Sequence, residues 1–431
     1  MDQVTVGIIG LIVFFALLIF GLPIGLGMAL VGFVGLWYFA GEPAAMIKMA
    51  LTPFSYASMA ELSVLPLFLL MANVLATSGI TRDLYNLAAK WLGRLPGGLA
   101  MGTIAGCAVF AGASASSIAT AATMGAVAVP EMKRYNYDPG LATGCIAAGG
   151  SLGILIPPSA MFILYGILTG TSIGRLFMAG VIPGILEAIF YIVTIYILCR
   201  RNPTYGPRGP AYSLKEKVMA IGSCGEIVGL IILVMAGIYL GWFTPSEAGA
   251  VGAIGAITFS LLRRRLNLKG FLEASLTTLK STGLIFFILI GAMIFGHFIV
   301  LSRIPYELAG FIAALPLPPL AIMGIIMVIY IFLGAIMDVS AMLVITTPIF
   351  FPVAMVLGFN PIWFGVIVTR MMEIGMITPP IGINVFVISG MSGEPLQTVF
   401  RGIVPFLISD IIHVTLLLFV PAVALFLPSM M

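Results

Sequence analysis

The stretch Gly112–Pro158 decides how this chain must fold. It opens with GASASSIATAATMGAVAVPEM (residues 112–132), and the sequence AAGGSLGILIPPS (residues 147–159) covers its end. Hydroxyl side chains and a glycine-rich break with two prolines stand here among strongly apolar neighbours. A lipid bilayer tolerates broken backbone only where protein or a watery cavity satisfies the free N–H and C=O groups, because each unpaired group is costly in hydrocarbon. We therefore expect this stretch to line a site.

The same pattern of glycines and prolines recurs 222 residues further along the chain. The matching pairs include Gly112 and Gly334, Ser116 and Asp338, Pro130 and Pro352, Gly153 and Gly375, Pro157 and Pro379, and Pro158 and Pro380. Further pairs, such as Pro23 and Pro245, keep the same offset outside this stretch. Chance matches between apolar, glycine-rich segments do not explain so many prolines in one register. We therefore predict an internal repeat, as many secondary transporters have.

The composition places the chain in the membrane. It has 61% apolar and only 8% charged residues, whereas about a quarter of a soluble domain is charged. The fold class predicted is an all-α polytopic membrane protein, surrounded by lipid. The formal charge of +4 lies mostly in loops, so it indicates topology and not nucleic-acid binding. The four cysteines lack CxxC spacing, which disfavours a zinc site or a disulfide framework.

Hairpins and broken helices are predicted at corresponding places in the two halves. Residues 99–130 and 318–352 are expected to be re-entrant hairpins, and residues 137–170 and 361–391 are expected to be helices broken near mid-membrane. Lys and Arg flank the first hairpin but not the second, and such residues concentrate in cytoplasmic loops. Five crossings per half then require the second copy to be inverted, with both termini periplasmic.

The expected organisation assigns a role to every part of the chain. Residues 1–60, which begin without the basic segment of a signal peptide, are predicted to form scaffold helices and an interfacial arm. Residues 61–199 would form the first half of a transport domain, with some scaffold contributions, and 200–220 a basic cytoplasmic linker. Residues 221–281 would repeat the scaffold helices and arm, and 282–431 would form the second transport half with the last span.

Candidate ion and substrate contacts lie at the tips and the breaks. Carbonyl groups at half-helix C-termini suit Na⁺, and N–H groups at half-helix N-termini suit an anion. The expected Na⁺ ligands are Ser114, Ser116, Ser117, Gly149, Gly153, Gly334, Asp338, Ser340, Thr378 and Gly382. The expected substrate contacts are Ser151, Pro157, Pro158, Thr347, Arg370, Glu373, Pro379, Pro380 and Asn384.

Each candidate also has a purely structural interpretation. Small Ser and Gly residues let membrane helices approach closely, whereas a carboxylate in the membrane, such as Asp338, favours function. Arg370 and Glu373 lie one helical turn apart, so they form either an ion pair or a substrate contact. The remaining ionisable side chains are expected to be interfacial or packed. These are Glu61, Glu187, Glu226 and Asp410 near span ends, and His297 and His413.

Three motifs carry a family resemblance. In chain order they are GASASSIATAATMGAVAVPEM, AAGGSLGILIPPS and MITPPIGINVF (residues 376–386). They closely resemble the large membrane subunit of tripartite ATP-independent periplasmic (TRAP) transporters, and the resemblance covers essentially all 431 residues. It implies an ion-transporter-type fold with a scaffold and a mobile elevator domain. It also implies Na⁺-coupled import, without ATP, of an organic acid such as a C4-dicarboxylate or sialic acid, with Na⁺ around the tips and breaks.

The same resemblance implies partners and a location. The chain is expected to act in the bacterial inner membrane with a small membrane subunit and a periplasmic substrate-binding protein. Two alternatives remain open on sequence alone. One is a stand-alone Na⁺ or H⁺ symporter of similar architecture, and the other is an intramembrane serine hydrolase pairing Ser116 with His297 or His413. The absence of a GxSxG motif counts against the hydrolase.

Overall fold

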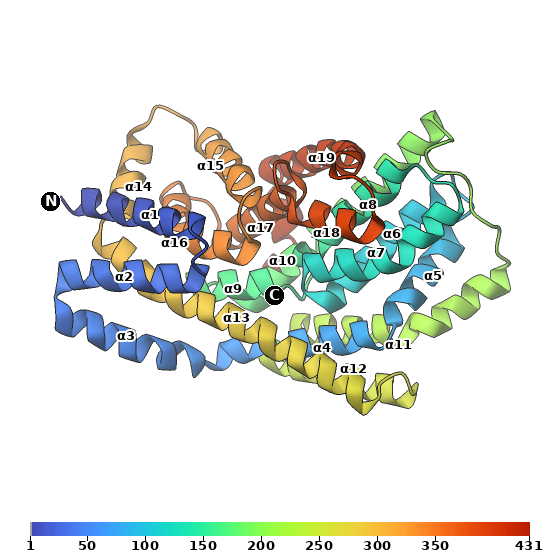
Figure 1. Ribbon diagram of the computed structural model, residues 1–431, viewed down its shortest axis with the longest axis horizontal. Coiled ribbons are helices and arrows are strands. Elements are labelled where there is room, and N and C mark those ends of the chain that lie inside the picture. Colours follow the sequence, from blue (N-terminus) through green and yellow to red (C-terminus); the bar gives the residue numbers. More distant parts are fainter. Residues whose placement is uncertain (1) are drawn as a thin grey trace.

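A computed structural model describes residues 2–431, except for the side chains of Ser223 and Ala313. Within that range the chain is helical and contains no strand, which confirms the all-α prediction (Figure 1). The first half comprises α1 (Gln3–Ile19), α2 (Ile24–Ala40), α3 (Glu42–Ala57), the 3₁₀ turn η1 (Ala60–Ser63), α4 (Val64–Thr77), α5 (Ile80–Leu92), α6 (Gly98–Ser114), α7 (Ser117–Arg134), α8 (Pro139–Leu155), α9 (Ala160–Thr169) and α10 (Ile173–Arg201). The second half comprises α11 (Leu214–Tyr239), α12 (Pro245–Leu262), α13 (Leu268–Leu301), α14 (Ile304–Ala314), α15 (Pro319–Gly334), α16 (Val339–Val356), α17 (Pro361–Ile377), α18 (Ile383–Ser392), α19 (Leu396–Phe419), α20 (Ala422–Leu425) and the 3₁₀ turn η2 (Pro428–Met430).

The helix bounds follow the sequence offset of 222 residues. Helices α7 and α16 match at both ends under this offset, and so do α8 and α17. The reason is local, since both α8 and α17 begin with a proline in the first turn behind a capping Asp138 or Asn360. Each then ends at a Pro–Pro pair in the cis form, Pro157–Pro158 or Pro379–Pro380. The two halves therefore share one order of elements.

Each predicted hairpin is a pair of helices joined at a short tip. In the first, α6 packs on α7 and the chain reverses through Ala115, whose φ is 50°, and Ser116, which caps α7. In the second, α15 packs on α16 and the tip runs from Ala335 to Asp338, which caps α16. The capping side chains accept from the first turn of the exit helix, so the helix starts where the sequence supplies an oxygen.

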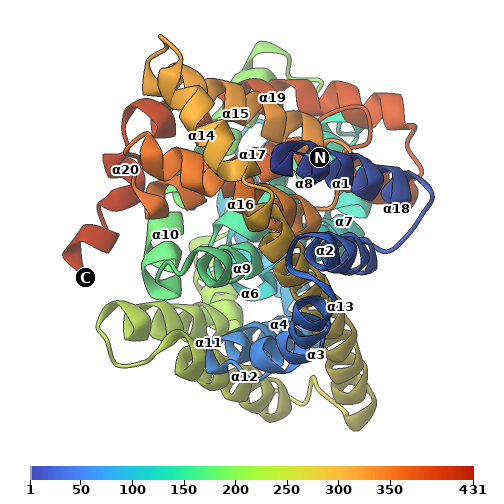
Figure 2. The same cartoon turned by 90° about the vertical axis from the view of Figure 1, so that its left-hand side faces the viewer.

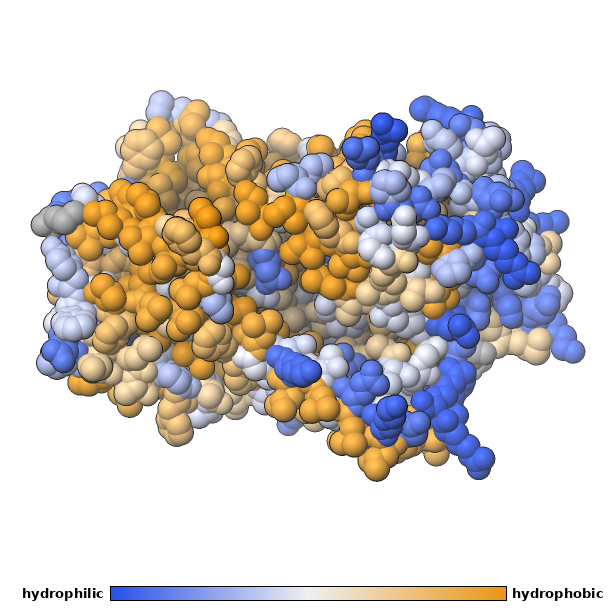
Figure 3. Space-filling view, viewed as in Figure 1, coloured by the Kyte–Doolittle hydropathy of each residue, from blue (hydrophilic) through white to orange (hydrophobic). Residues whose placement is uncertain are grey.

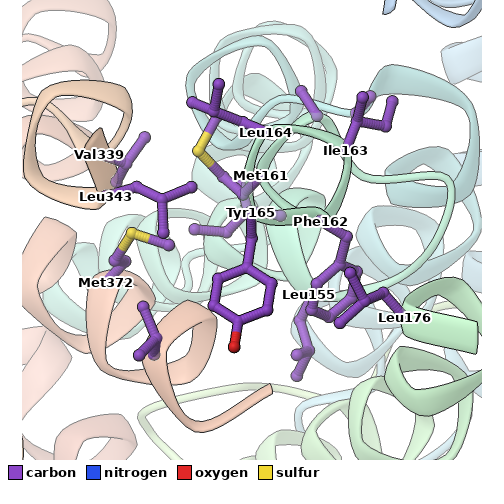
Figure 4. Packing of buried hydrophobic residues seen from close by; sticks show 14 of the residues in the cluster. Leu155, Met161, Phe162, Ile163, Leu164, Tyr165, Leu176, Val339, Leu343 and Met372 are labelled. Carbon is purple, nitrogen blue, oxygen red and sulfur yellow. The ribbon is translucent and has the colours of Figure 1, made fainter. Parts of the chain in front are cut away.

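The hairpin of each half packs on a helix of the other half. Helix α7 of the first hairpin packs on α18, which follows the break of the second half. Helix α16 of the second hairpin packs on α9, which follows the break of the first half. Figure 4 shows this second contact, with Leu343 and Val339 of α16 facing the α9 side chains around Tyr165. The Tyr165 hydroxyl donates to the Pro361 carbonyl at the start of α17 (2.7 Å). The helix that follows each break thus packs on the hairpin of the other half.

A separate group of helices flanks this arrangement. Helix α13 packs on α2 and α4, and α12 packs on α4 and α11. In Figure 2 this group lies in the lower part of the molecule, and α15, α17 and α19 lie in the upper part. The linker between α10 and α11 returns to the base of the first hairpin, where Gly206 accepts from Gly97 N–H and Gly209 donates to Gly93 (both 2.8 Å).

The repeat departs from symmetry at the interfacial arm. In the first half α3 is separated from α4 by Ser58, Met59 and η1. In the second half the corresponding residues form one helix of 34 residues, α13, so the arm expected within residues 221–281 is not a separate element. A continuous run without proline explains the difference, because nothing in residues 268–301 interrupts the helical hydrogen bonds.

The surface is that of a multi-pass membrane protein. Seven helices in the described chain are long and apolar enough to cross a bilayer, or eight if the two parts of α11, which meet at a 53° bend, count as one span. Apolar residues cover most of the visible surface in Figure 3, and hydrophilic residues gather at the right-hand end. Exposed cations of the α10–α11 region include Arg200, Arg201, Arg208 and Lys215.

Candidate transport site

The first tip brings together oxygen atoms from three hydroxyl residues. The Ser114 hydroxyl lies within hydrogen-bonding distance of the Thr120 hydroxyl and of the Ser116 carbonyl oxygen (3.2 Å). Thr120 also donates to that carbonyl (2.8 Å). Ser114 is 3% exposed and Thr120 is fully buried. The turn at Ala115 creates this cluster, because it folds the end of α6 back against the first turn of α7.

The first break supplies the other wall of this oxygen cluster. An added Cβ at Gly153, near the end of α8, would lie 2.6 Å from the Ser116 carbonyl oxygen and 2.8 Å from the Thr120 hydroxyl. Only a residue without a side chain fits there. Gly149 contacts α6 in the same way, since its Cβ would lie 2.9 Å from Cys107 Sγ. Pro157 and Pro158 are buried. The tip and the break therefore pack directly on each other.

Ser117 joins the first hairpin to the second half. Its hydroxyl accepts from Asn384 Nδ2 (2.7 Å), which also donates to the Ala147 carbonyl in α8 (3.2 Å). Asn384 is fully buried, and its Oδ1 has no hydrogen-bond partner among the described residues. A buried acceptor without a donor is costly, so this oxygen is suited to a ligand that carries positive charge or an N–H or O–H group.

The second tip carries a carboxylate. Asp338 is half-buried and accepts from the backbone N–H of Ser340 (2.9 Å), which is 8% exposed. The tip sits on α17 through two glycines, because an added Cβ at Gly375 would lie 2.6 Å from Gly334 Cα. Asp338 is thus held at the tip with one carboxylate oxygen satisfied by its own helix.

The second break is more open than the first. Pro379 and Pro380 are exposed, and Thr378 is half-buried with its hydroxyl donating to the Ile374 carbonyl (2.6 Å). Gly382 begins α18 with a φ of +59°, a conformation that glycine adopts without strain. Thr378, Pro379 and Pro380 therefore lie at an accessible break, whereas Gly153, Pro157 and Pro158 at the first break are buried.

The hydroxyl groups of two expected substrate contacts donate hydrogen bonds to carbonyl groups of their own helices. Ser151 is fully buried and donates to the Ala148 carbonyl of α8 (2.6 Å). Thr347 is 2% exposed and donates to the Leu343 carbonyl of α16 (2.5 Å). Neither hydroxyl lies among the tip residues described above. Their role as substrate contacts remains a prediction.

Arg370 and Glu373 lie in a fully buried ionic cluster. Arg370 Nη1 contacts Glu187 Oε1 (2.5 Å) and Glu373 Oε2 (2.8 Å), and its Nη2 contacts Asp410 Oδ1 (2.5 Å). All four side chains are 0% exposed. The expectation that Glu187 and Asp410 are interfacial is wrong, because both lie well inside their helices, α10 and α19.

The histidines are not placed for hydrolase chemistry. The Ser116 hydroxyl accepts from the Ala119 N–H (3.4 Å). His297 contacts Lys48 (3.1 Å), and buried His413 packs against Phe190 with ring centroids 5.6 Å apart. Within the described residues neither imidazole is a hydrogen-bond partner of Ser116, so the geometry of an activated serine is not present.

Comparison with known proteins identifies the family. The sequence model described as "Tripartite ATP-independent periplasmic transporter, DctM component" matches residues 11–423. The chain is 36% identical over 389 residues to the C4-dicarboxylate TRAP transporter large permease protein DctM of Pseudomonas aeruginosa, covering 90% of this chain and 91% of the relative.

The chain belongs to the DctM family of TRAP transporter large permeases. It is also 32% identical over 371 residues to the sialic acid TRAP transporter large permease protein SiaM of Vibrio cholerae, covering 85% of each chain. The fold is similar to that of the YdaH transporter of Alcanivorax borkumensis, with a TM-score of 0.55 and 15% identity over 85% of this chain and 88% of that one. The resemblance read from the three motifs is confirmed. A DctM-family permease is a multi-pass subunit of a transporter, which places the chain in the inner membrane.

Three residues of this arrangement, Thr120, Glu187 and Asp410, are not among the site residues expected from the sequence. Thr120 was not among the expected ligands, although its spacing four residues after Ser116 puts the two on one helical face. Glu187 and Asp410 were assigned to span ends. The signal in the sequence is their position within long apolar runs, together with a cation, Arg370, in another such run.

Proposed function

We propose that this DctM-family permease couples Na⁺ entry to the import of an organic acid. The observation that carries the proposal is the first tip, where the hydroxyls of Ser114 and Thr120 and the carbonyl of Ser116 converge against Gly153. Hydroxyl and carbonyl oxygens are ligands for a hard cation, and an interrupted helix is where secondary transporters coordinate Na⁺. At the second tip, Asp338 and Gly334, which packs on Gly375, would bind a second Na⁺.

The substrate would lie between the breaks. Helices α9 and α18, ten residues each, begin at the two breaks and direct their N-terminal N–H groups there. Such termini favour a carboxylate through their free N–H groups and positive dipole ends. Two relatives bear names of transporters for a C4-dicarboxylate and for sialic acid, which are both carboxylates. We infer a small organic anion as cargo, with the unpaired Oδ1 of Asn384 facing an O–H or N–H group of cargo or a bound cation.

The two halves would be oriented oppositely in the membrane. The first hairpin is flanked by Arg94, Lys133 and Arg134, whereas the bases of the second, LPLPP (residues 315–319) and LGFNP (residues 357–361), hold no cation. Positive loops face the cytoplasm, so the first hairpin would open inward and the second outward, with both termini periplasmic. The exposed second break is compatible with an outward-accessible site.

Transport would proceed by movement of one group of helices against another. The helices α2, α4 and α11–α13 would act as the scaffold, and the hairpins with α8, α9, α17 and α18 would carry the cargo as an elevator. Na⁺ bound at the tips would favour the loaded state, because a ligand shifts such an equilibrium only by its different affinity for the two states. Membership in a tripartite family implies a small membrane subunit and a periplasmic substrate-binding protein as partners.

Reconstitution tests the proposal. The permease with its small subunit is placed in liposomes, the binding protein loaded with a dicarboxylate or sialic acid is added outside, and an inward Na⁺ gradient is imposed without ATP. We expect accumulation that collapses when K⁺ replaces Na⁺. Accumulation that is unchanged in K⁺ would rule out Na⁺ coupling. Uptake of free cargo without the binding protein would instead indicate a stand-alone symporter.

A further inference from the structure

The charges of the Arg370 cluster do not balance. One guanidinium faces three carboxyl groups, from Glu187 on α10, Glu373 on α17 and Asp410 on α19. A guanidinium stays protonated in proteins. If all three carboxyls were ionised, the cluster would carry a net charge of −2 with every side chain 0% exposed. Burying uncompensated charge is strongly unfavourable, so groups in such places are neutralised.

The hydrogen bonds of the cluster point to the neutralising species. Each carboxyl gives one oxygen to Arg370, and the second oxygens, Glu187 Oε2, Glu373 Oε1 and Asp410 Oδ2, have no hydrogen-bond partner among the described residues. Glu187 and Glu373 bind the same Arg370 nitrogen, so their carboxyl groups are neighbours. The fully buried Tyr191 hydroxyl also lacks a bond in good geometry and lies beside Glu187 and Asp410. A proton on a carboxyl oxygen supplies the missing donor.

The ionisable groups of the cluster come from the three helices that form it, α10, α17 and α19. The ionisable groups that face it are Tyr191 from α10, Arg370 from α17 and His413 from α19, besides the three carboxyls. Most other elements that pack on these three helices contain no charged residue: α6, α8, α9, α15, α16, α18, α20 and η2. Helix α11, which also packs on α10, carries charges, but none of them acts on the cluster. In the described chain no cluster of His, Cys, Asp and Glu side chains has the arrangement of a metal site. Protons fit the site better than a metal cation.

We propose that the Arg370 cluster is a proton-binding site, in which two of the three carboxyl groups are protonated at neutral pH. Arg370 then pairs with one carboxylate, and the cluster is neutral. Because Glu187 belongs to the first half and the other members to the second, the bound protons hold α10 against α17 and α19. Loss of a proton leaves buried negative charge in this joint and weakens it. The inference does not depend on the cargo or on the coupling ion.

The pH dependence of stability follows from proton counting. At neutral pH the native state holds about two protons that the unfolded chain lacks, because ordinary exposed carboxyls lose their protons near pH 4. Stability falls with rising pH wherever the native state binds more protons than the unfolded state. We therefore expect the thermal midpoint of the purified permease to fall as the pH is raised through and above neutrality. The double variant Glu187→Gln/Glu373→Gln replaces two neutral acids by neutral isosteres and should lose most of this slope.

Infrared spectroscopy tests the proposal directly. Purified permease at pH 7 should show the C=O stretch of protonated carboxyl groups, shifted in D₂O, and Glu187→Gln/Glu373→Gln should remove most of it. Glu394→Gln, which alters a partly exposed partner of Lys133, is the control and should leave the band intact. A wild-type spectrum without this band, or a band unchanged in the double variant, would overturn the proposal. If the double variant does not fold, the wild-type band decides alone. Stability that requires Na⁺ at pH 7, with no such band, would assign the neutralising charge to a metal ion and also overturn it.

Discussion

The tip of the first hairpin holds hydroxyl groups that bond one another, whereas the tip of the second holds a carboxylate that caps its own helix. Ser114 and Thr120 are buried, and they contact the carbonyl of half-buried Ser116 beside a break whose prolines are also buried. Asp338 is half-buried beside a break whose prolines are exposed. A repeat can therefore keep its backbone and change its chemistry, because glycine and proline fix where helices end while the side chains between them are free to differ.

The largest effect is expected at the charged tip. Asp338→Ala should lower Na⁺-driven uptake by about ten- to a hundredfold, since contacts of charged groups are worth about 1.5–3 kcal/mol. Its positional counterpart, Ser116→Ala, removes only a hydroxyl, while the carbonyl of residue 116 stays in place. It should cost less.

Asp338→Asn separates charge from shape and should behave like Asp338→Ala. Surface expression and detergent stability serve as controls for insertion. Uptake by Asp338→Ala that equals wild type would remove the contrast between the tips.

Gly153 and Gly375 are equivalent glycines that each contact a hairpin tip, so the same substitution can be made at both. Gly153→Ala places a methyl group 2.6 Å from the Ser116 carbonyl oxygen, and Gly375→Ala places one 2.6 Å from Gly334 Cα. Overpacking of this kind costs about 1–3 kcal/mol. We expect both to slow uptake by about tenfold. If Na⁺ binds at the first tip as proposed, Gly153→Ala should raise the half-saturating Na⁺ concentration more, because its methyl group displaces the Ser116 carbonyl oxygen.

Gly283→Ala is the matched control for both substitutions, since no atom lies within 4 Å of its added Cβ. Equal shifts in Na⁺ dependence for Gly153→Ala and Gly375→Ala would mean that the tips do not differ in ion binding.

A moderate effect is expected where the first hairpin meets the second half. Ser117→Ala and Asn384→Ala each break the bond between Ser117 and Asn384. A double-mutant cycle on uptake rates should give a coupling of about 1 kcal/mol, or roughly fivefold. Strictly additive effects would show that this bond does not contribute to transport.

The smallest effect is expected at the far end of the first hairpin. Lys133 contacts Glu394 (2.9 Å) and the Ser392 carbonyl (2.8 Å), and the equivalent position in the second half is Met355. Because exposed ion pairs contribute about 0–1 kcal/mol and are screened by salt, Lys133→Met should change uptake by about twofold or less. That change should disappear at high ionic strength. A large, salt-independent loss would instead give the pair a structural role.

The sequence predicted best where backbone chemistry decides. The ends of α8 and α17 and the positions of both tips follow from Gly, Pro and capping residues, which act locally. It predicted least well where distant segments meet. The bond between Ser117 and Asn384 spans 267 residues, and no local pattern pairs them. Glu187 and Asp410 were assigned to span ends because their burial depends on how α10, α17 and α19 pack.

Helix α13 is longer than the hydrocarbon layer of a bilayer is thick. Its 34 residues extend about 51 Å at 1.5 Å per residue, whereas the hydrocarbon layer is about 30 Å thick. An unbroken rod of this length must lean steeply or project into the aqueous phase. The first thirteen residues of α13 include Lys269, Glu273 and Lys280, so this polar end lies outside the hydrocarbon, and residues 281–301, about 32 Å long, span it. Because no break separates the two parts, any tilt of the membrane-spanning part of α13 swings its polar end along the membrane surface.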